Sequence, residues 1–123
     1  MIQGVVTEQR TAVIPLTLQG TMGQEDTVPT ILDTGFNGFL TLPLPQIAKL
    51  GFPYQGSMRA VLGNGREAEL DVFAGTVIWD GQVQAVMVLA ADGSPLVGMG
   101  LLEGSRVMLD VTDNGPVAID RLP

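Results

Sequence analysis

Asp33 lies between two apolar runs in the stretch of residues 30–43, which reads TILDTGFNGFLTLP. An acid at the end of a hydrophobic strand costs free energy unless a partner stabilises it or its charge takes part in a reaction. Thr34 and Gly35 follow directly. Gly35 allows the backbone to approach the carboxyl group, and the Thr34 hydroxyl can form a hydrogen bond that orients it. Asp33 therefore either begins a turn or carries chemistry.

Two absent residue types restrict what that chemistry can be. The 123 residues include no cysteine and no histidine. Disulfides, thiolate zinc sites and cysteine nucleophiles are thereby excluded, as are Ser-His pairs and most transition-metal sites. Enzyme chemistry would have to use carboxylates, hydroxyls, the single lysine or backbone groups. We expect no metal and no organic cofactor.

Hydrolysis of a peptide bond by carboxyl groups needs two of them around one water molecule. The ionised group acts as general base on the water, and the protonated group polarises the carbonyl and later assists the departing amine. Two carboxyl groups in contact titrate as a pair. The chain has one Asp-Thr-Gly, because the Asp-Gly pairs at 80–81 and 92–93 lack the threonine. A two-fold homodimer would bring two copies of Asp33 together.

Composition and charge set the general class. A length of 123 residues and a hydrophobic content of 46% predict a single globular domain over residues 1–123. The net charge of -7, with six scattered basic residues, argues against nucleic acid. We expect no membrane association and a cytoplasmic location, because the chain shows no secretory signal and its longest apolar run is 85–91.

Short segments rich in β-branched residues alternate with glycine-containing turns, which predicts an all-β barrel or sandwich. The strongest hairpin signal is Gly63-Asn64-Gly65, and Asp-Gly at 80–81 and Asn-Gly at 114–115 give two more. One helix is predicted at 44–50, which has prolines early and Gly51 after its end, and a single helical turn at 99–103. Strands are predicted at 2–6, 12–18, 27–32, 39–42, 57–62, 66–73, 76–79, 82–89, 106–111 and 117–120.

Two further motifs accompany Asp33, namely the glycine hairpin and the run Leu96-Val97-Gly98 before Leu101-Leu102. In this order and at these separations, the motifs resemble those of the retropepsin-like aspartic proteases, the group that contains retroviral proteases and small bacterial relatives. The resemblance covers roughly residues 12–110. The segments ILDTGFNGFLTLP and PLVGMGLL resemble those of the bacterial single-domain members.

The resemblance implies a partly closed barrel with one or two short helices and a flap hairpin. It also implies an aspartic endopeptidase that acts as a homodimer on peptide or protein substrates. Asp33 would be the catalytic acid, with Thr34 and Gly35 completing its loop. Residues 96–98 would lie beneath that loop, and 101–102 would form the helix behind it. The resemblance implies Gly63, Asn64 and Gly65 as the flap tip and Leu62 and Leu96 as residues lining the substrate cleft.

The chain departs from the retroviral pattern in three places, one of which is the flap tip at 62–66, where the retroviral proteins are richer in glycine and isoleucine. Phe36 stands where those proteins usually have alanine, and Met99 stands where they usually have arginine. Two arrangements of the termini are open. The strands at 2–6 and 117–122 can interleave with those of a second subunit, or the hairpin at 114–115 can fold back on its own subunit.

Three alternatives also remain open. The chain could be a non-catalytic peptide-binding or dimerisation module on the same fold, with Asp33 as a structural acid. It could be a β-barrel that binds carbohydrate or another small molecule, which would require an acid pair within one subunit. The alternating acids Glu67, Glu69 and Asp71 could form a calcium site, although a solvated outer face of the flap hairpin is favoured.

Overall fold

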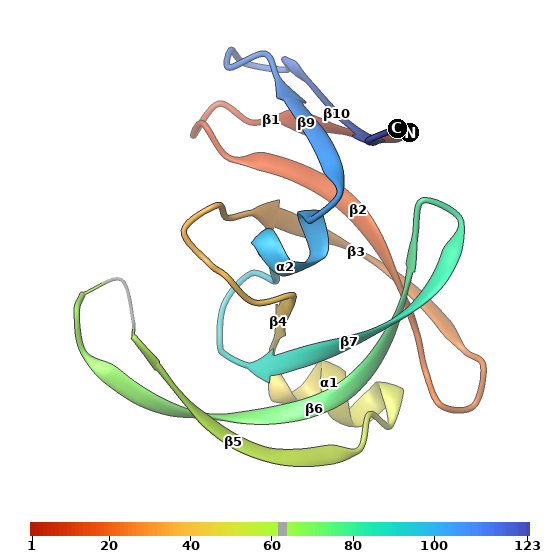
Figure 1. Ribbon diagram of the computed structural model, residues 1–123, viewed down its shortest axis with the longest axis vertical. Helices are drawn as coiled ribbons and strands as arrows, with labels where there is room; N and C mark the ends of the chain where they lie inside the picture. The colour runs from red at the N-terminus through yellow and green to blue at the C-terminus, as the bar shows by residue number, and fades with distance from the viewer. Residues whose placement is uncertain (62–63) are drawn as a thin grey trace.

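The computed structural model describes residues 1–61 and 64–123, and all of its strands belong to one ten-stranded sheet (Figure 1). The predicted all-β class is confirmed, since only two short helices accompany the sheet. The elements are β1 (Ile2–Val6), β2 (Ala12–Gln19), β3 (Glu25–Leu32), β4 (Leu40–Leu42), α1 (Leu44–Leu50), β5 (Tyr54–Val61), β6 (Glu67–Trp79), β7 (Gln82–Ala90), β8 (Leu96–Val97), α2 (Met99–Leu102), β9 (Ser105–Leu109) and β10 (Pro116–Arg121).

The strand order is β5-β6-β7-β4-β8-β3-β2-β1-β10-β9. Most neighbours are antiparallel, but the central strands include two parallel pairs, β3 with β8 and β4 with β7. An additional antiparallel pairing joins β6 to β2, with Thr17 opposite Ile78 and Leu18 opposite Val77. This pairing brings two distant parts of the strand order together and encloses the core between them.

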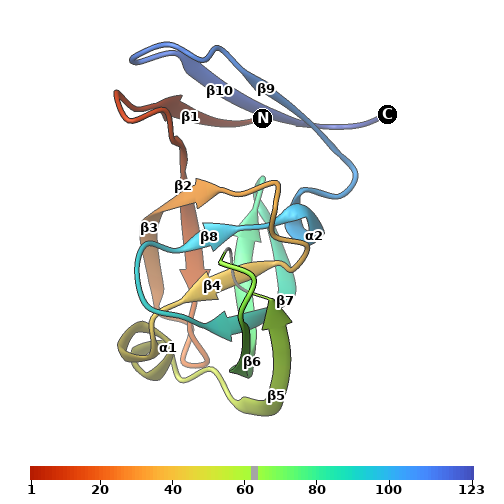
Figure 2. The ribbon, with the colours of Figure 1, turned by 90° about the vertical axis from the view of Figure 1, so that its left-hand side faces the viewer.

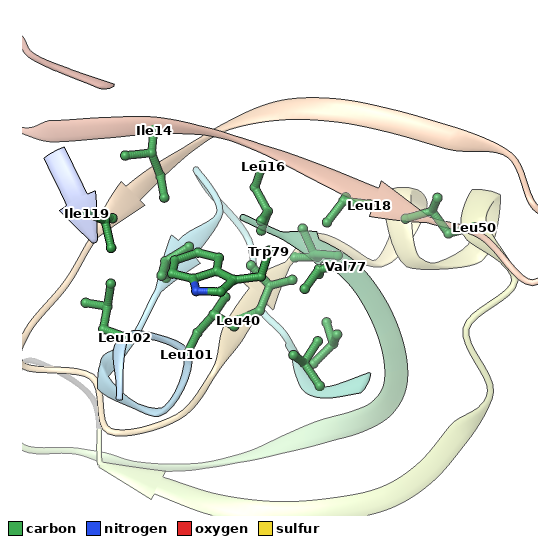
Figure 3. Packing of buried hydrophobic residues seen from close by; sticks show 14 of the residues in the cluster. Ile14, Leu16, Leu18, Leu40, Leu50, Val77, Trp79, Leu101, Leu102 and Ile119 are labelled. Carbon is green, nitrogen blue, oxygen red and sulfur yellow. The ribbon is translucent and has the colours of Figure 1, made fainter. Parts of the chain in front are cut away.

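The core is formed mainly by aliphatic side chains from both parts of the sheet. Figure 3 shows Trp79 in the middle of this cluster, with Leu16 on one side and Leu40 and Leu101 on the other. Trp79 is 7% exposed, so it is a core residue. Because Leu101 belongs to α2, the core also fixes the short helix that follows the Leu96-Val97-Gly98 motif.

The two ends of the chain pair with each other. Ile2 of β1 lies opposite Ile119 of β10, and β10 pairs in turn with β9. In Figure 2 these three strands form a separate layer above the rest of the sheet. Asn114 at the turn between β9 and β10 has a φ of 61°, which asparagine tolerates better than most residues. The hairpin thus folds back on its own subunit, which is one of the two arrangements predicted for the termini.

Several predicted elements have the expected bounds, including β1 and α1. The predicted break between 66–73 and 76–79 is wrong, because β6 is a single strand of 13 residues. Gly75 lies in its middle. A Cβ there would lie 2.6 Å from Val88 and 3.0 Å from Phe52, so the glycine permits close packing within a continuous strand.

Within the described residues, no helix has the length and hydropathy needed to cross a bilayer.

Candidate active site

Asp33 directly follows β3, and its backbone is fixed by the neighbouring strand β8. The Asp33 N–H donates to the Val97 carbonyl at 2.9 Å, and the Ile31 N–H donates to Pro95 in the same way at 2.9 Å. These bonds continue the parallel pairing of Ile31 with Leu96. The two central strands β3 and β8 therefore fix the position of Asp33 at the start of its loop.

The carboxyl group is oriented by its own loop. The Gly35 N–H donates to Asp33 Oδ1 at 2.9 Å, and the Phe36 N–H donates to the Asp33 carbonyl at 3.2 Å. Asp33 is half-buried, whereas Thr34 and Gly35 are exposed. Among the described residues no second hydrogen bond to this carboxyl group is present, so Oδ2 is available to water or to another molecule.

The rest of the loop is held by the residues around the start of α2. The N–H groups of Gly98, Met99 and Gly100 donate to carbonyl groups of residues 36–39, at 3.0, 2.7 and 2.9 Å. Gly98 is buried, and a Cβ on it would overlap the Gly38 carbonyl oxygen and the Phe36 ring. The glycine of the Leu96-Val97-Gly98 motif is thus required by close contact with the Asp33 loop.

A groove of about 690 Å³ separates this loop from β5, and we call it the flap groove. In Figure 1 the β5–β6 hairpin and the loop between β3 and β4 lie on the same side of the molecule. Phe39, Met58 and Met87 also line an adjoining groove of about 580 Å³ beneath β5–β7. Together the two grooves form an extended and mainly apolar surface. The flap groove is lined by Gly35, Phe36, Asn37, Gly38, Phe39, Met58, Arg59, Ala60, Val61, Met87 and Leu89.

A third groove, of about 590 Å³, lies on the other side of the same loop, and we call it the β9 groove. Thr34 and Asn37 line it from the loop, Met99 from α2 and Val107 from β9. Asn37 lines both grooves. Residues 34–37 therefore form a ridge that separates the flap groove from the β9 groove.

The predicted flap tip is described in part. Asn64 and Gly65 lie in an exposed turn, where the Arg66 N–H donates to Asn64 Oδ1 at 3.0 Å. Gly65 has a φ of 82°, a conformation that favours glycine. Gly63 and the predicted cleft residue Leu62 lie outside the described residues. The arms of the predicted hairpin are present, since β5 and β6 pair as far as Val61 opposite Glu67.

The structure places the predicted cleft residue Leu96 on β8, half-buried beside Ile31. The Leu96 N–H donates to the Thr41 hydroxyl oxygen at 2.9 Å. Leu96 lines neither of the grooves around the loop, so its contact with substrate stays a prediction.

Sequence reasoning missed Met58 and Met87 as groove residues. Phe52 is buried, whereas Phe36 and Phe39 are half-buried and line the flap groove. The available signal was the alternation of β5, which gives Met58 the same face as the partly buried Gly56 and Ala60.

Two of the three acids of β6 have side-chain partners on the neighbouring strand. Arg59 lies 3.5 Å from Glu67, and the Ser57 hydroxyl donates to Glu69 at 2.6 Å. All four side chains are exposed. Throughout residues 1–61 and 64–123 no group of three or more acids is arranged to hold a metal ion.

Comparisons with models of known families, with curated proteins and with solved structures find no match for this chain.

Proposed function

We propose that this chain is one subunit of a homodimeric aspartic endopeptidase with a retropepsin-like, partly closed barrel fold. The observation that carries the proposal is the setting of Asp33. Its backbone is bound to Val97, one carboxyl oxygen is bound by Gly35, and its loop borders an apolar groove opposite a hairpin. The β2–β6 pairing, which brings distant strands together, supports the barrel.

The second carboxyl group comes from a second copy of Asp33. In the dimer the two acids hold one proton and one water molecule between them. The ionised carboxylate takes a proton from the water as its oxygen attacks the peptide carbonyl, while the protonated carboxyl donates to the carbonyl oxygen. The C–N bond then breaks and the nitrogen leaves with a proton from the pair. Water is thereby added across the peptide bond.

The substrate is an extended peptide with apolar side chains. Main-chain groups of such a peptide can pair with a strand edge, while alternate side chains enter pockets on one side. The flap groove and its neighbour offer Phe39, Met58 and Met87 for those side chains. Methionine adapts its shape to different partners, so the groove is suited to several apolar residues rather than one.

Asp33→Asn tests the proposal directly. Cleavage of a mixture of unstructured apolar peptides, read by mass spectrometry, should fall by about 10²-fold or more, because asparagine cannot act as a general base. Asp92→Asn is the matched control, because Asp92 is an exposed aspartate that lines none of the grooves described above. The control should cleave at the original rate.

Undiminished cleavage by Asp33→Asn would contradict the proposal. Absence of hydrolysis by the original chain, together with peptide binding that Asp33→Asn does not change, would favour the non-catalytic peptide-binding module instead.

A further inference from the structure

The strand β9 is an outer strand of the sheet, with β10 as its neighbour. An outer strand presents unpaired backbone groups that can bind another strand, and proteins usually cover such an edge or place charges along it. Here three successive residues are apolar and exposed. The exposed fractions are 36% for Val107, 61% for Met108 and 41% for Leu109. The edge of β9 is thus apolar on both faces.

The backbone hydrogen bonds to β10 show which groups of β9 are free. The Asp110 N–H donates to Pro116, and the Gly104 carbonyl accepts from Leu122, at 3.1 and 2.9 Å. Backbone groups alternate in direction along a strand, so the even-numbered residues face β10. The N–H and carbonyl groups of Val107 and Leu109 consequently point to the open edge.

The residues of this edge are arranged symmetrically about Met108. Val107 and Leu109 flank it, and beyond them stand Arg106 and Asp110, which carry opposite charges. Met108, Arg106 and Asp110 share one face of the strand, because side chains two apart point to the same side.

We propose that β9 pairs antiparallel with β9 of a second copy of this chain, with Met108 opposite Met108 on the two-fold axis. Val107 of each copy then lies opposite Leu109 of the other. The free backbone groups of these residues form two hydrogen-bonded pairs, one on each side of the axis. Arg106 of each copy lies opposite Asp110 of the other, so two ion pairs close the outer face.

The charges select this register over its neighbours. A two-fold axis at Val107 would place Arg106 opposite Met108, and an axis at Leu109 would place Asp110 opposite Met108. Only the axis at Met108 pairs both charges. None of the ion pairs found in residues 1–61 and 64–123 includes Arg106 or Asp110, and both are exposed, so both are available to a second copy.

The position of β9 connects this pairing to the Asp33 loop. Val107 and Thr34 line the same β9 groove, so one interface can include both the strand and the ridge beside Asp33. The inference deepens the proposed function, because it names the surface through which the second subunit, with its own Asp33, would bind. The β9 pairing rests on the proposed function only for this link to Asp33.

A single cysteine tests the register. The chain has no cysteine of its own, so Met108→Cys introduces one thiol per subunit. The residues of a non-hydrogen-bonded antiparallel pair have Cα atoms about 4.5 Å apart, within the range that a disulfide can bridge. Met108→Cys should therefore form a covalent dimer under mild oxidation. Met22→Cys is the control, because Met22 is 87% exposed and lies outside β9.

Cross-linking of Met108→Cys that is no faster than that of Met22→Cys would overturn the pairing. Species that grow beyond a dimer would also overturn it, because they would indicate head-to-tail pairing of β9 with the other outer strand, β5.

Charge exchange provides a second measurement. Asp110→Arg places like charges opposite each other twice and should raise the dimer dissociation constant about tenfold in sedimentation experiments. Adding Arg106→Asp should restore the original value, because the charges are opposite again. Arg106 also lies opposite Asp120 of β10, so Asp110→Arg is the cleaner single change. The triple variant Asp110→Arg, Arg106→Asp, Asp120→Arg also restores opposite charges between β9 and β10, and its failure to recover would overturn the register.

Failure of this inference can be told apart from failure of the proposed function. A cross-linked Met108→Cys dimer without Asp33-dependent hydrolysis would leave the pairing intact and refute the protease. Asp33-dependent hydrolysis without a Met108→Cys cross-link would support the protease and refute the β9 pairing.

Discussion

Gly98 lies in direct contact with Phe36, and no space remains between them for a side chain on the glycine. A Cβ on Gly98 would lie 2.5 Å from Phe36 Cδ2 and would overlap the Gly38 carbonyl oxygen. The backbones are joined as well, since the Met99 N–H donates to the Phe36 carbonyl at 2.7 Å. The loop that carries Asp33 and the start of α2 are therefore one packed unit.

Gly98→Ala should destabilise the protein by about 1–3 kcal/mol, because overpacking forces the neighbouring backbone to move. The urea midpoint measures this loss. Hydrolysis should fall further than stability explains, because a shift of about 1 Å in a catalytic group can cost about 10²-fold in rate. Gly20→Ala is the control, because the atoms nearest to its Cβ would be the end of the Gln24 side chain rather than backbone. Equal midpoints for the two variants would contradict the packing argument.

Local signals in the sequence were sufficient for most of the elements. The proline pair and Gly51 defined α1 with its observed bounds, and Gly51 indeed has a φ of 74° at the end of the helix. The predicted strands at 66–73 and 76–79 form one strand, β6, which contains Gly75. Glycine fits there because the side chains of Val88 and Phe52, from other segments of the chain, pack against it.

The site was predictable in its acid but not in its surroundings. Asp-Thr-Gly and Leu96-Val97-Gly98 are local motifs, and the structure joins them through the bond from Asp33 to Val97. Met58 and Met87 become groove residues only through the pairing of β5, β6 and β7, which sets their distance from the Asp33 loop. Such long-range register cannot be read from composition or spacing.

The two groove methionines provide a test of substrate binding. Met58 is 43% and Met87 50% exposed, so each has apolar surface left to bury against a peptide. Removing that surface by Met58→Ala or Met87→Ala should cost about 1 kcal/mol, or about fivefold in kcat/KM for apolar peptides. Met22→Ala serves as the control, because Met22 lies in neither of the two connected grooves. Equal kcat/KM values in all three variants would exclude these grooves as the peptide site.

The amino group of Met1 gives a pH-dependent contribution to stability in a chain that begins there. It lies 2.9 Å from Asp80 Oδ1, and this hydrogen bond is the main cause that raises the pKa of the amino group above its ordinary value. A raised pKa in the folded state means that the stabilisation is full below the unfolded pKa, about 8, and is lost as the pH rises through the folded pKa.

Asp80→Asn should therefore reduce the loss of thermal stability between about pH 7 and about pH 10, and the effect should be small because the pair is exposed. Asparagine tolerates the φ of 51° at this turn, so the turn is preserved. Asp92→Asn should keep the original pH dependence. A pH dependence that is identical in Asp80→Asn and the original chain would contradict the assignment.

Thr34 tests whether the ridge beside Asp33 meets a second subunit. Thr34 is exposed, and its hydroxyl forms no hydrogen bond with any residue that the structure describes in the same chain. Thr34→Val keeps the shape of the side chain, so it should change the stability of the isolated subunit by less than about 0.5 kcal/mol. We expect this exposed hydroxyl to form a hydrogen bond across the two-fold axis of the proposed dimer. Losing two such bonds should raise the dimer dissociation constant about tenfold or more.

Thr34→Ser retains the hydroxyl and should associate like the original chain. Sedimentation over a range of concentrations measures the dissociation constant, and peptide cleavage at matched dimer concentration separates association from chemistry. If the dimer dissociation constant of Thr34→Val equals that of the original chain, the ridge does not form a hydrogen bond to a second copy. If Thr34→Ser is as weak as Thr34→Val, keeping the hydroxyl does not restore association, and the assignment to a hydrogen bond fails. Only the pattern in which serine rescues and valine does not supports two Asp33 loops in contact.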